Sequence, residues 1–441
     1  MRRKIHKISK RNIKKRKQRK ALGMKNKKEE YTEWKRRLQE RVLARLDYTR
    51  NLSDEEVREV IDQVMLQEEL AAWESLEQVK QAGEEIFCSL RRLDVLQGFI
   101  DDPAVTEIMV NGAENIYIEQ DGALKKAVCR FESKEKLQDV IQQIVAGCNR
   151  VVNEASPIVD ARLDNGARVN IVMDPVALNG PIVTIRRFPD RPITMQDLIA
   201  DSAISLEAAD FLKGLVKAKY NILISGGTGS GKTTFLNVLS GYIPPEERIV
   251  TIEDSAELQL QGLGNVVSLE TRNKNMTGCG EITIRDLIRT SLRMRPDRII
   301  VGEVRGAEAV DMMQALNTGH DGSMSTAHAN SAGDLLFRLE NMIMMGMDIP
   351  LNAIRRQISS GVDIVVHLSR FRDRSRRVEE IQEIIGFEKD TVLTQTLFAF
   401  EEYGVDAEGK ILGQLVKKGE LIHDEKLKKS GICQNTAGVS A

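Results

Sequence analysis

The spacing of apolar residues divides the chain into regions with different periods. Residues 30–99 repeat apolar side chains at helical spacing, with polar residues between them. Over residues 100–188 apolar and polar residues mostly alternate, which is typical of strands, and only residues 133–149 return to a helical period. Beyond residue 193 short apolar runs alternate with helical segments. That order predicts an α/β sheet covered by helices.

Local motifs support these assignments. Residues 53–56 (Ser-Asp-Glu-Glu) and 75–78 (Ser-Leu-Glu-Gln) have the form of capping boxes that open helices. Residues 164–166 (Asp-Asn-Gly) lie between two alternating segments, which predicts a β-hairpin. Pro189 and Pro192 disfavour both helix and strand, so we predict a linker at this point.

The predicted strands of the α/β region are short and apolar. They are Ile222–Ser225, Ile249–Ile252, Val266–Leu269, Ile299–Val301, Ser323–Thr326 and Ile364–Val366.

We therefore predict six regions along the chain. They are a basic leader (1–29), a helical segment (30–99), a small α+β domain (100–188), a linker (189–193), an α/β domain (194–402) and a polar C-terminal tail (403–441) that frays.

Composition narrows the class of protein. Aromatic residues make up only 4% of the 441 residues, and no apolar run is long enough to span a membrane or to serve as a signal peptide. The five cysteines are odd in number and scattered, without a Cys-x-x-Cys pair. We therefore expect a cytoplasmic protein with reduced thiols and no zinc site.

Charge is concentrated at the N-terminus. Residues 1–28 contain fifteen Lys or Arg residues and no acidic residue, although the whole chain has a net charge of −1. Such a block repels itself and should be disordered. Three interpretations stay open: contact with anionic lipid, contact with nucleic acid, and an extension without function, since Met24 is an alternative start. Of the two functional interpretations we favour anionic lipid.

The most specific motif is a phosphate-binding loop. Residues 226–233 read Gly-Gly-Thr-Gly-Ser-Gly-Lys-Thr and lie between an apolar strand and an apolar helix, as this loop requires. Lys232 would reach the β- and γ-phosphates of a nucleotide, and Thr233 would offer its hydroxyl to Mg²⁺. The predicted ATP-binding residues are Gly226, Gly227, Thr228, Gly229, Ser230, Gly231, Lys232, Thr233 and Thr234.

Hydrolysis also needs a carboxylate near the γ-phosphate to position or deprotonate water. Glu253 and Asp254 follow one predicted strand, and Glu303 follows another. Because ligands of an α/β sheet bind at the carboxyl ends of the strands, these acids should lie at the edge where the loop lies. Either acid alone could simply face solvent, but the two together downstream of the loop favour a site.

In their order along the chain, these motifs resemble those of a known family. After the loop come residues 251–258 (Thr-Ile-Glu-Asp-Ser-Ala-Glu-Leu), 292–306 (with Arg-Ile-Ile-Val-Gly-Glu), 318–320 (Thr-Gly-His) and 325–330 (Ser-Thr-Ala-His-Ala-Asn). They are similar to the Walker A, Asp box, Walker B and His box of type II/type IV secretion-system ATPases. The branch they resemble most drives tight-adherence (Flp-type) pilus assembly, the CpaF-like proteins. The resemblance extends over about residues 43–400.

The resemblance implies a RecA-like P-loop ATPase domain that uses ATP and Mg²⁺. It also implies roles for individual residues: Glu303 as general base, Glu253, Asp254 and Glu257 near metal-bound water with Thr233, and His328 and His320 as sensors of the γ-phosphate. For His320 the competing interpretation is a buried histidine with a structural partner.

In this family the N-terminal α+β domain supplies arginines to the phosphates. Arg168 and Arg186 match that pattern, and Arg162 and Arg187 match it less well. The competing interpretation is that these arginines are surface strand residues paired with Asp160 or Asp164.

By the same resemblance the chain would form a homohexamer that turns or pushes a membrane platform protein to extract pilin subunits. It would lie in the cytoplasm, at the inner face of the cytoplasmic membrane. The chain lacks the four-cysteine zinc module of some type II secretion members, which argues against that branch. Two alternatives stay open: an ATPase of conjugation or DNA uptake, and a nucleotide-gated scaffold with little turnover.

Overall fold

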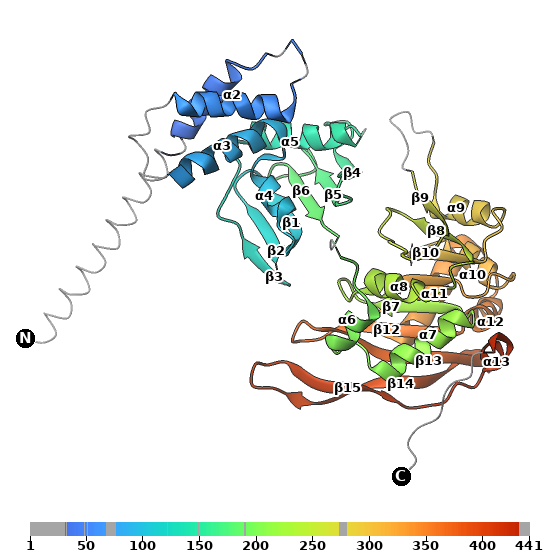
Figure 1. The fold of residues 1–441 in the computed structure, drawn as a ribbon. Helices are drawn as coiled ribbons and strands as arrows, with labels where there is room; N and C mark the ends of the chain where they lie inside the picture. Colours follow the sequence, from blue (N-terminus) through green and yellow to red (C-terminus); the bar gives the residue numbers. More distant parts are fainter. Residues whose placement is uncertain are drawn as a thin grey trace, which may run out of the picture. The chain divides into compact units, whose positions relative to one another are not determined.

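The structure is a computed structural model that describes residues 31–431 apart from residues 32, 48, 51, 68–75, 121, 149, 189–190 and 273–279. The predicted basic leader, the Ser75 helix start and part of the predicted linker lie outside the described residues. The chain divides into two compact units, Met1–Asp190 and Arg191–Ala441, and the division falls within residues 189–193 (Figure 1).

The first unit begins with a helical layer. Residues 33–43 are helical, and they are followed by α2 (Asp54–Leu66) and α3 (Leu76–Arg91). The predicted capping box at Ser53 is confirmed, because its side chain accepts from Glu56 N–H and Glu56 binds back to the Ser53 N–H. These helices bury one apolar cluster, which includes Trp34, Leu38, Val57, Ile61, Ile86 and Phe87.

A small α+β layer completes the first unit. The described strands form a six-stranded antiparallel sheet in the order β3-β2-β1-β6-β5-β4, with α5 (Lys134–Gly147) packed on it through Leu137, Ile141 and Ile144. A short helical turn, η2 (Asp94–Leu96) and α4 (Gln97–Asp101), leads into this sheet. The strands are β1 (Val105–Asn111), β2 (Ile116–Gln120), β3 (Ala123–Lys126), β4 (Ile158–Arg162), β5 (Arg168–Val172) and β6 (Ile182–Arg186).

The predicted hairpin at Asp164-Asn165-Gly166 joins β4 and β5. Gly166 has φ +86°, a backbone conformation that favours glycine, and Leu163 N–H donates to Ala167 O across the turn. The turn therefore places Arg162 and Arg168 opposite each other, as their strand pairing shows.

The second unit is built on one large sheet. Its described strands form a nine-stranded sheet in the order β15-β14-β13-β12-β7-β11-β10-β8-β9, parallel from β12 to β9 and antiparallel from β12 to β15. All six predicted strands are present, as β7 to β12. The strands are β7 (Ile222–Gly226), β8 (Arg248–Glu253), β9 (Asn265–Glu270), β10 (Arg298–Val304), β11 (Met324–His328), β12 (Ile364–Arg370), β13 (Arg376–Glu388), β14 (Thr391–Val405) and β15 (Ile411–Lys417).

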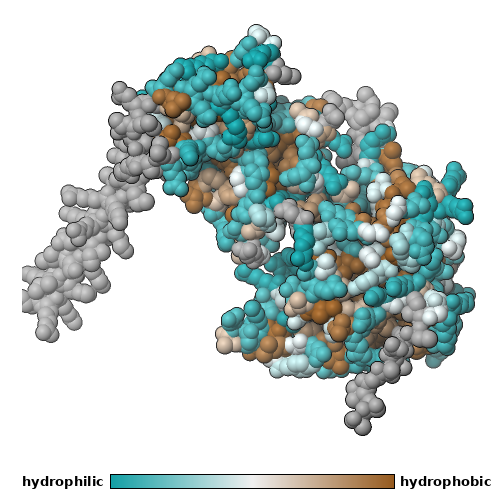
Figure 2. Space-filling model, in the orientation of Figure 1, coloured by the Kyte–Doolittle hydropathy of each residue, from teal (hydrophilic) through white to brown (hydrophobic). Residues whose placement is uncertain are grey.

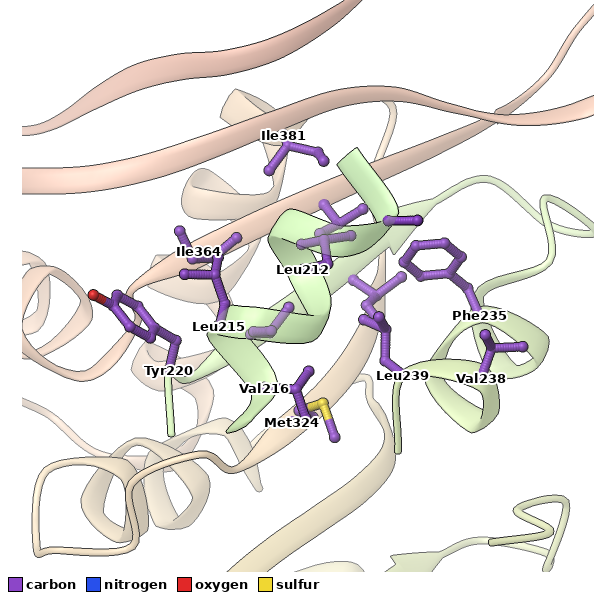
Figure 3. Close-up of a cluster of buried hydrophobic side chains, with 14 of the residues drawn as sticks. Leu212, Leu215, Val216, Tyr220, Phe235, Val238, Leu239, Met324, Ile364 and Ile381 are labelled. Atoms are coloured by element: carbon purple, nitrogen blue, oxygen red, sulfur yellow. The ribbon is translucent and has the colours of Figure 1, made fainter. Parts of the chain in front are cut away.

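Helices cover both faces of the parallel part, so its strands are apolar on both sides. Ile222 and Ile224 of β7 belong to one core, and Leu223 between them belongs to the other. Figure 3 shows Leu212 and Phe235 among the side chains gathered in the first core. The helices that contribute to this first core are α6 (Met195–Ala200), α7 (Leu206–Lys217), α8 (Lys232–Ser240) and α13 (Glu425–Ser430), and those of the second are α9 (Ile284–Ser291), α10 (Ala309–Leu316), α11 (Ala332–Gly346) and α12 (Leu351–Gly361).

The predicted fraying tail from residue 403 is wrong for the described residues up to 431. Strand β14 continues to Val405, β15 pairs with it, and α13 follows. The reason is that Leu415 and Leu427, although set in polar sequence, are buried in the core of the second unit. The sheet of the second unit therefore extends well beyond the predicted end at residue 402.

Hydrophilic residues cover most of the visible face of the described residues (Figure 2). In the described part of the chain, no helix combines the length and the apolar character needed to cross a membrane.

Candidate active site

The phosphate loop connects the end of β7 to the start of α8, as predicted. Gly226, Gly229 and Gly231 have φ values of +157°, +71° and +96°, which L side chains rarely adopt. A Cβ on Gly226 would lie 2.4 Å from both Leu368 O and Ser230 Oγ. Only glycine fits at position 226, because the loop passes close to β12 there.

Lys232 lies folded over this loop. Its side chain is buried, at 7% exposure, and its Nζ donates to Gly226 O at 3.1 Å and to Gly227 O at 3.0 Å. The same Nζ lies 3.3 Å from Nδ1 of His328. The ammonium group is therefore held at the mouth of the loop, where an entering phosphate can replace the carbonyl oxygens as its partner.

The first turn of α8 adds further groups that favour an anion. Thr233 and Thr234 are half-buried there, directly after Lys232. The unpaired N–H groups and the dipole at a helix N-terminus attract negative charge. Loop and helix together present groups whose chemistry suits a polyphosphate.

Glu303 is positioned at the same edge by β10. Arg305 donates from Nη2 to Oε2 of Glu303 at 2.7 Å, while Nε2 of His328 lies 2.9 Å from Oε1. Oε1 is buried and accepts no hydrogen bond from any described residue. A buried acceptor without a donor lowers the stability of the protein unless another group donates a hydrogen bond to it. This oxygen is therefore available to a water molecule at the site.

His328 ends β11 and pairs in register with Gly226, the first residue of the loop. Its pKa is lowered from 6.5, first by burial and then by the charge of Lys232, although Glu303 acts in the opposite direction. The imidazole is therefore neutral at pH 7. Since Lys232 donates to Nδ1, the proton of the neutral ring lies on Nε2. Nε2 is 2.9 Å from Oε1 of Glu303, but the ring is not oriented to form a hydrogen bond with that oxygen.

Glu253 is the second carboxylate at this edge, and it is almost completely buried at 4% exposure. Its Oε1 accepts the N–H groups of Glu257 at 2.8 Å and Leu258 at 3.0 Å. Burial raises its pKa to about 7 in spite of these bonds. A Cβ on Gly302 would lie 2.9 Å from Cγ of Glu253, so a glycine next to Glu303 makes room for this side chain.

The predicted metal ligands Thr233, Asp254 and Glu257 do not form one cluster of side chains. Asp254 is exposed and lies 3.6 Å from Nη1 of Arg305, and Glu257 contributes its N–H to Glu253. Among the described residues, no group of three or more His, Cys, Asp or Glu side chains could hold a metal ion. Mg²⁺ that binds with a nucleotide needs only one or two protein ligands, so the Thr233 hydroxyl fits it. The metal role of Thr233, Asp254 and Glu257 stays a prediction.

His320 does not belong to this edge of the sheet. It precedes β11, whereas His328 ends it, and its Nδ1 lies 3.3 Å from Ala315 O. The neighbouring Ser323 N–H donates to Asn221 at the start of β7, opposite the end that carries the loop. The structure therefore contradicts the prediction that His320 senses the γ-phosphate. The residue has a partner in Ala315 O, but it is half-buried and not the buried histidine of the competing interpretation.

The predicted arginines of the first unit form a row across three strands. Arg168 is the register partner of Arg162 on β4 and of Arg186 on β6. Residues directly opposite in antiparallel strands share a face, so the three guanidinium groups lie on one side of the sheet. Arg187, in contrast, donates to Val105 O at 3.1 Å and to Asp102 O, which gives it a structural role within the unit.

Two residues at the site escaped the sequence analysis. Arg305 binds Glu303, and the only signal for it was its place two residues after that carboxylate. His367 of β12 is buried, and its Nδ1 lies 2.8 Å from Oγ of Ser225, the residue before the loop. Nothing in an apolar strand pattern distinguishes such an internal polar partner from a surface residue.

Comparison with known proteins identifies the class to which this site belongs. The family model described as "Type II/IV secretion system protein" matches residues 91–407. The chain therefore belongs to the type II/IV secretion-system ATPase family, and it is an ATPase.

Two relatives and one solved structure illustrate this similarity. Conjugal transfer protein TrbB of Rhizobium radiobacter is 32% identical over 306 residues, which cover 69% of this chain and 91% of the relative. The type IV secretion system protein PtlH homolog of Bordetella bronchiseptica is 34% identical over 316 residues, covering 66% and 93%. The pilus retraction motor PilT with bound ADP matches with a TM-score of 0.50 and 19% identity, over 76% of this chain and 86% of PilT. This similarity confirms the predicted fold class, a RecA-like ATPase domain preceded by a smaller α+β domain.

Proposed function

We propose that the chain is a hexameric motor that hydrolyses ATP to power assembly of a tight-adherence (Flp-type) pilus, as the CpaF-like resemblance of its motifs suggests. One observation supports hydrolysis above all: Glu303 keeps a buried oxygen without a hydrogen-bond donor from the described residues, beside a histidine that also contacts Lys232.

The proposed chemistry follows from these contacts. Lys232 and the loop N–H groups bind the phosphates, and Thr233 would hold Mg²⁺, which neutralises phosphate charge when bound. Glu303 then positions a water molecule and accepts its proton through Oε1, while Arg305 holds Oε2. When Lys232 turns to a phosphate, His328 loses its donor. This links the state of the nucleotide to the end of β11.

Motion would come from the first unit. We propose that Arg168 and Arg186 reach the phosphates and stabilise charge in the transition state. Hydrolysis would then move the first unit against the second around residues 188–192, of which 189 and 190 lie outside the described residues.

The proposed partners are membrane platform proteins, at the inner face of the cytoplasmic membrane. The fifteen basic residues of the leader, residues 1–28, would add contact with anionic lipid. Deleting the leader should weaken binding to anionic vesicles and leave ATP hydrolysis unchanged. Salt-dependent binding of DNA that is lost with the same deletion would instead support a nucleic-acid role.

A second candidate is an ATPase of conjugation, because the relative TrbB is named a conjugal transfer protein. Replacing the chromosomal copy by the Glu303→Gln variant in its own cells separates the candidates. We expect surface pili to be lost while plasmid transfer stays at its wild-type frequency. Lost transfer with intact pili would favour conjugation, and full activity of the variant in both assays would favour a nucleotide-gated scaffold. An abundance-matched wild-type strain is the control.

A further inference from the structure

The hairpin between β12 and β13 contains five arginines, and two of them have partners within the second unit. Arg372 forms an ion pair with Glu402, and Arg377 lies 3.6 Å from Asp373 and donates to the Ile411 carbonyl. Within the part of the chain that the structure describes, the side chains of Arg370, Arg374 and Arg376 have no hydrogen bond or ion pair. Of these three, Arg370 and Arg376 are the ones that lie against the phosphate loop.

These two arginines lie directly across from each other, at the ends of β12 and β13. Like charges directly opposite each other on antiparallel strands destabilise the pair. Lys232 and the start of α8 add more positive charge nearby. A bound anion would relieve this repulsion.

Both side chains lie along the phosphate loop. Leu368 is the register partner of Gly226, so β12 carries Arg370 past the start of the loop. A Cβ built on Gly229 would lie 4.0 Å from Nη1 of Arg370, and one on Gly231 would lie 3.8 Å from Cδ of Arg376. An anion bound by the phosphate loop would therefore lie within reach of both arginines.

The order of the strands indicates which part of that anion they meet. On one side of β7 lie β11 and β10, which carry His328 and Glu303, and on the other side lies β12 with Arg370. Water attack on the γ-phosphate takes place on the Glu303 side. The arginines lie on the opposite side of the loop, where the α- and β-phosphates of a nucleotide would lie if its γ-phosphate faces Glu303.

We propose that Arg370 and Arg376 bind the α- and β-phosphates of the nucleotide, from the same chain that provides the loop. Guanidinium groups suit this role because their planar N–H groups match phosphate oxygens in pairs. The inference rests on the proposed binding of ATP at the loop. It differs from the role proposed for Arg168 and Arg186, which act on the transition state.

The test compares Arg370→Ala/Arg376→Ala with a charge-matched control, Arg374→Ala/Lys389→Ala, in the full-length protein. Arg374 lies on the same hairpin and Lys389 is exposed near the next turn, so the control removes the same charge from the second unit. Calorimetry with Mg²⁺ and ADP should show affinity about tenfold weaker or more for the test variant and within about twofold of wild type for the control. At saturating ATP the kcat of the test variant should stay within about twofold of wild type, since the loss is in binding.

Each outcome decides the proposal. Unchanged ADP affinity in the test variant, or an equal loss in the control, overturns it. A lowered kcat with unchanged ADP affinity also overturns it, because the arginines would then act on the transition state.

Arg370→Lys/Arg376→Lys, which keeps the charge, should recover part of the lost affinity. No recovery, or a melting temperature below that of the control, would assign the loss of affinity to a folding defect and overturn the proposal. If the wild type and Lys232→Ala bind ADP equally, the proposed site itself fails.

Discussion

Nε2 of His328 lies 2.9 Å from Oε1 of Glu303, and the other ring nitrogen of His328 lies 3.3 Å from Nζ of Lys232. One imidazole thus contacts both the group that holds phosphate and the carboxylate placed to activate water. Because the neutral ring accepts from Lys232 and lies against Glu303, a change at either residue alters the surroundings of the other.

Replacing His328 by alanine should therefore lower kcat by about tenfold or more, because Glu303 loses the neighbour that orients its free oxygen. The affinity for ADP should change by less than about threefold, since the loop keeps its own N–H groups. Phosphate release and ADP calorimetry measure the two quantities. His320→Ala, at the opposite edge of the sheet, is the control, and we expect it to leave both unchanged. A kcat equal to that of wild type would contradict the proposed role of His328.

The Glu303→Gln variant should lose turnover by about a hundredfold or more and still bind ATP with near wild-type affinity. The amide keeps the shape of the side chain but cannot accept a proton from water. A filter-binding assay with labelled ATP, run beside the turnover assay, separates binding from chemistry. Weak ATP binding together with normal turnover per bound ATP would show that Glu303 serves only to bind.

Most of this edge of the sheet could be predicted from the sequence because each motif follows a strand. The strand ends at Gly226, Glu253 and Glu303 fix where their side chains lie once the sheet is parallel. His320 shows the limit of this reasoning. It lies only eight residues from His328, but a five-residue strand carries the two to opposite ends of the sheet. Sequence distance alone does not reveal that separation.

Long-range contacts account for the other differences. Arg370 and Arg376 come close to the loop only because β12 pairs with β7, about 140 residues earlier in the chain. The C-terminal hairpin was predicted to fray because its residues are mostly polar, yet Leu415 and Leu427 are buried in the core. In each case the decisive partner is distant in sequence, and local periodicity carries no information about it.

The pKa of Glu253 predicts how stability depends on pH. Its value of about 7 in the folded protein lies above the ordinary 4.5, so the folded state holds this proton more tightly than the unfolded state. The contribution of Glu253 to stability is therefore most favourable at low pH and falls as pH rises from about 4.5 through about 7, by up to about 3 kcal/mol.

Glu253→Gln, which mimics the protonated side chain, removes this dependence. Without nucleotide, the variant should melt close to wild type at pH 5 and above it at pH 8.5. Scanning calorimetry at the two values measures the shift. A difference in melting temperature that is the same at both pH values would show that Glu253 is ionised throughout.

Arg168→Ala and Arg186→Ala should each lower kcat by about tenfold or more, with a smaller effect on ADP affinity, because guanidinium groups act on charge that develops in the transition state. Both residues lie on strands of the first unit, and neither is part of the apolar core of that unit. Arg130→Ala, an exposed residue paired with Glu114, is the control in the same unit. Unchanged phosphate release in both variants would assign the arginines to surface ion pairs.

We propose that a triphosphate held by Lys232 is hydrolysed at this site. The most direct measurement is release of inorganic phosphate from ATP and Mg²⁺ by the assembled full-length protein, with Lys232→Ala measured in parallel. We predict steady release by the wild type and at least about a hundredfold less by the variant. Equal release by the two proteins, or none by either, would contradict the account.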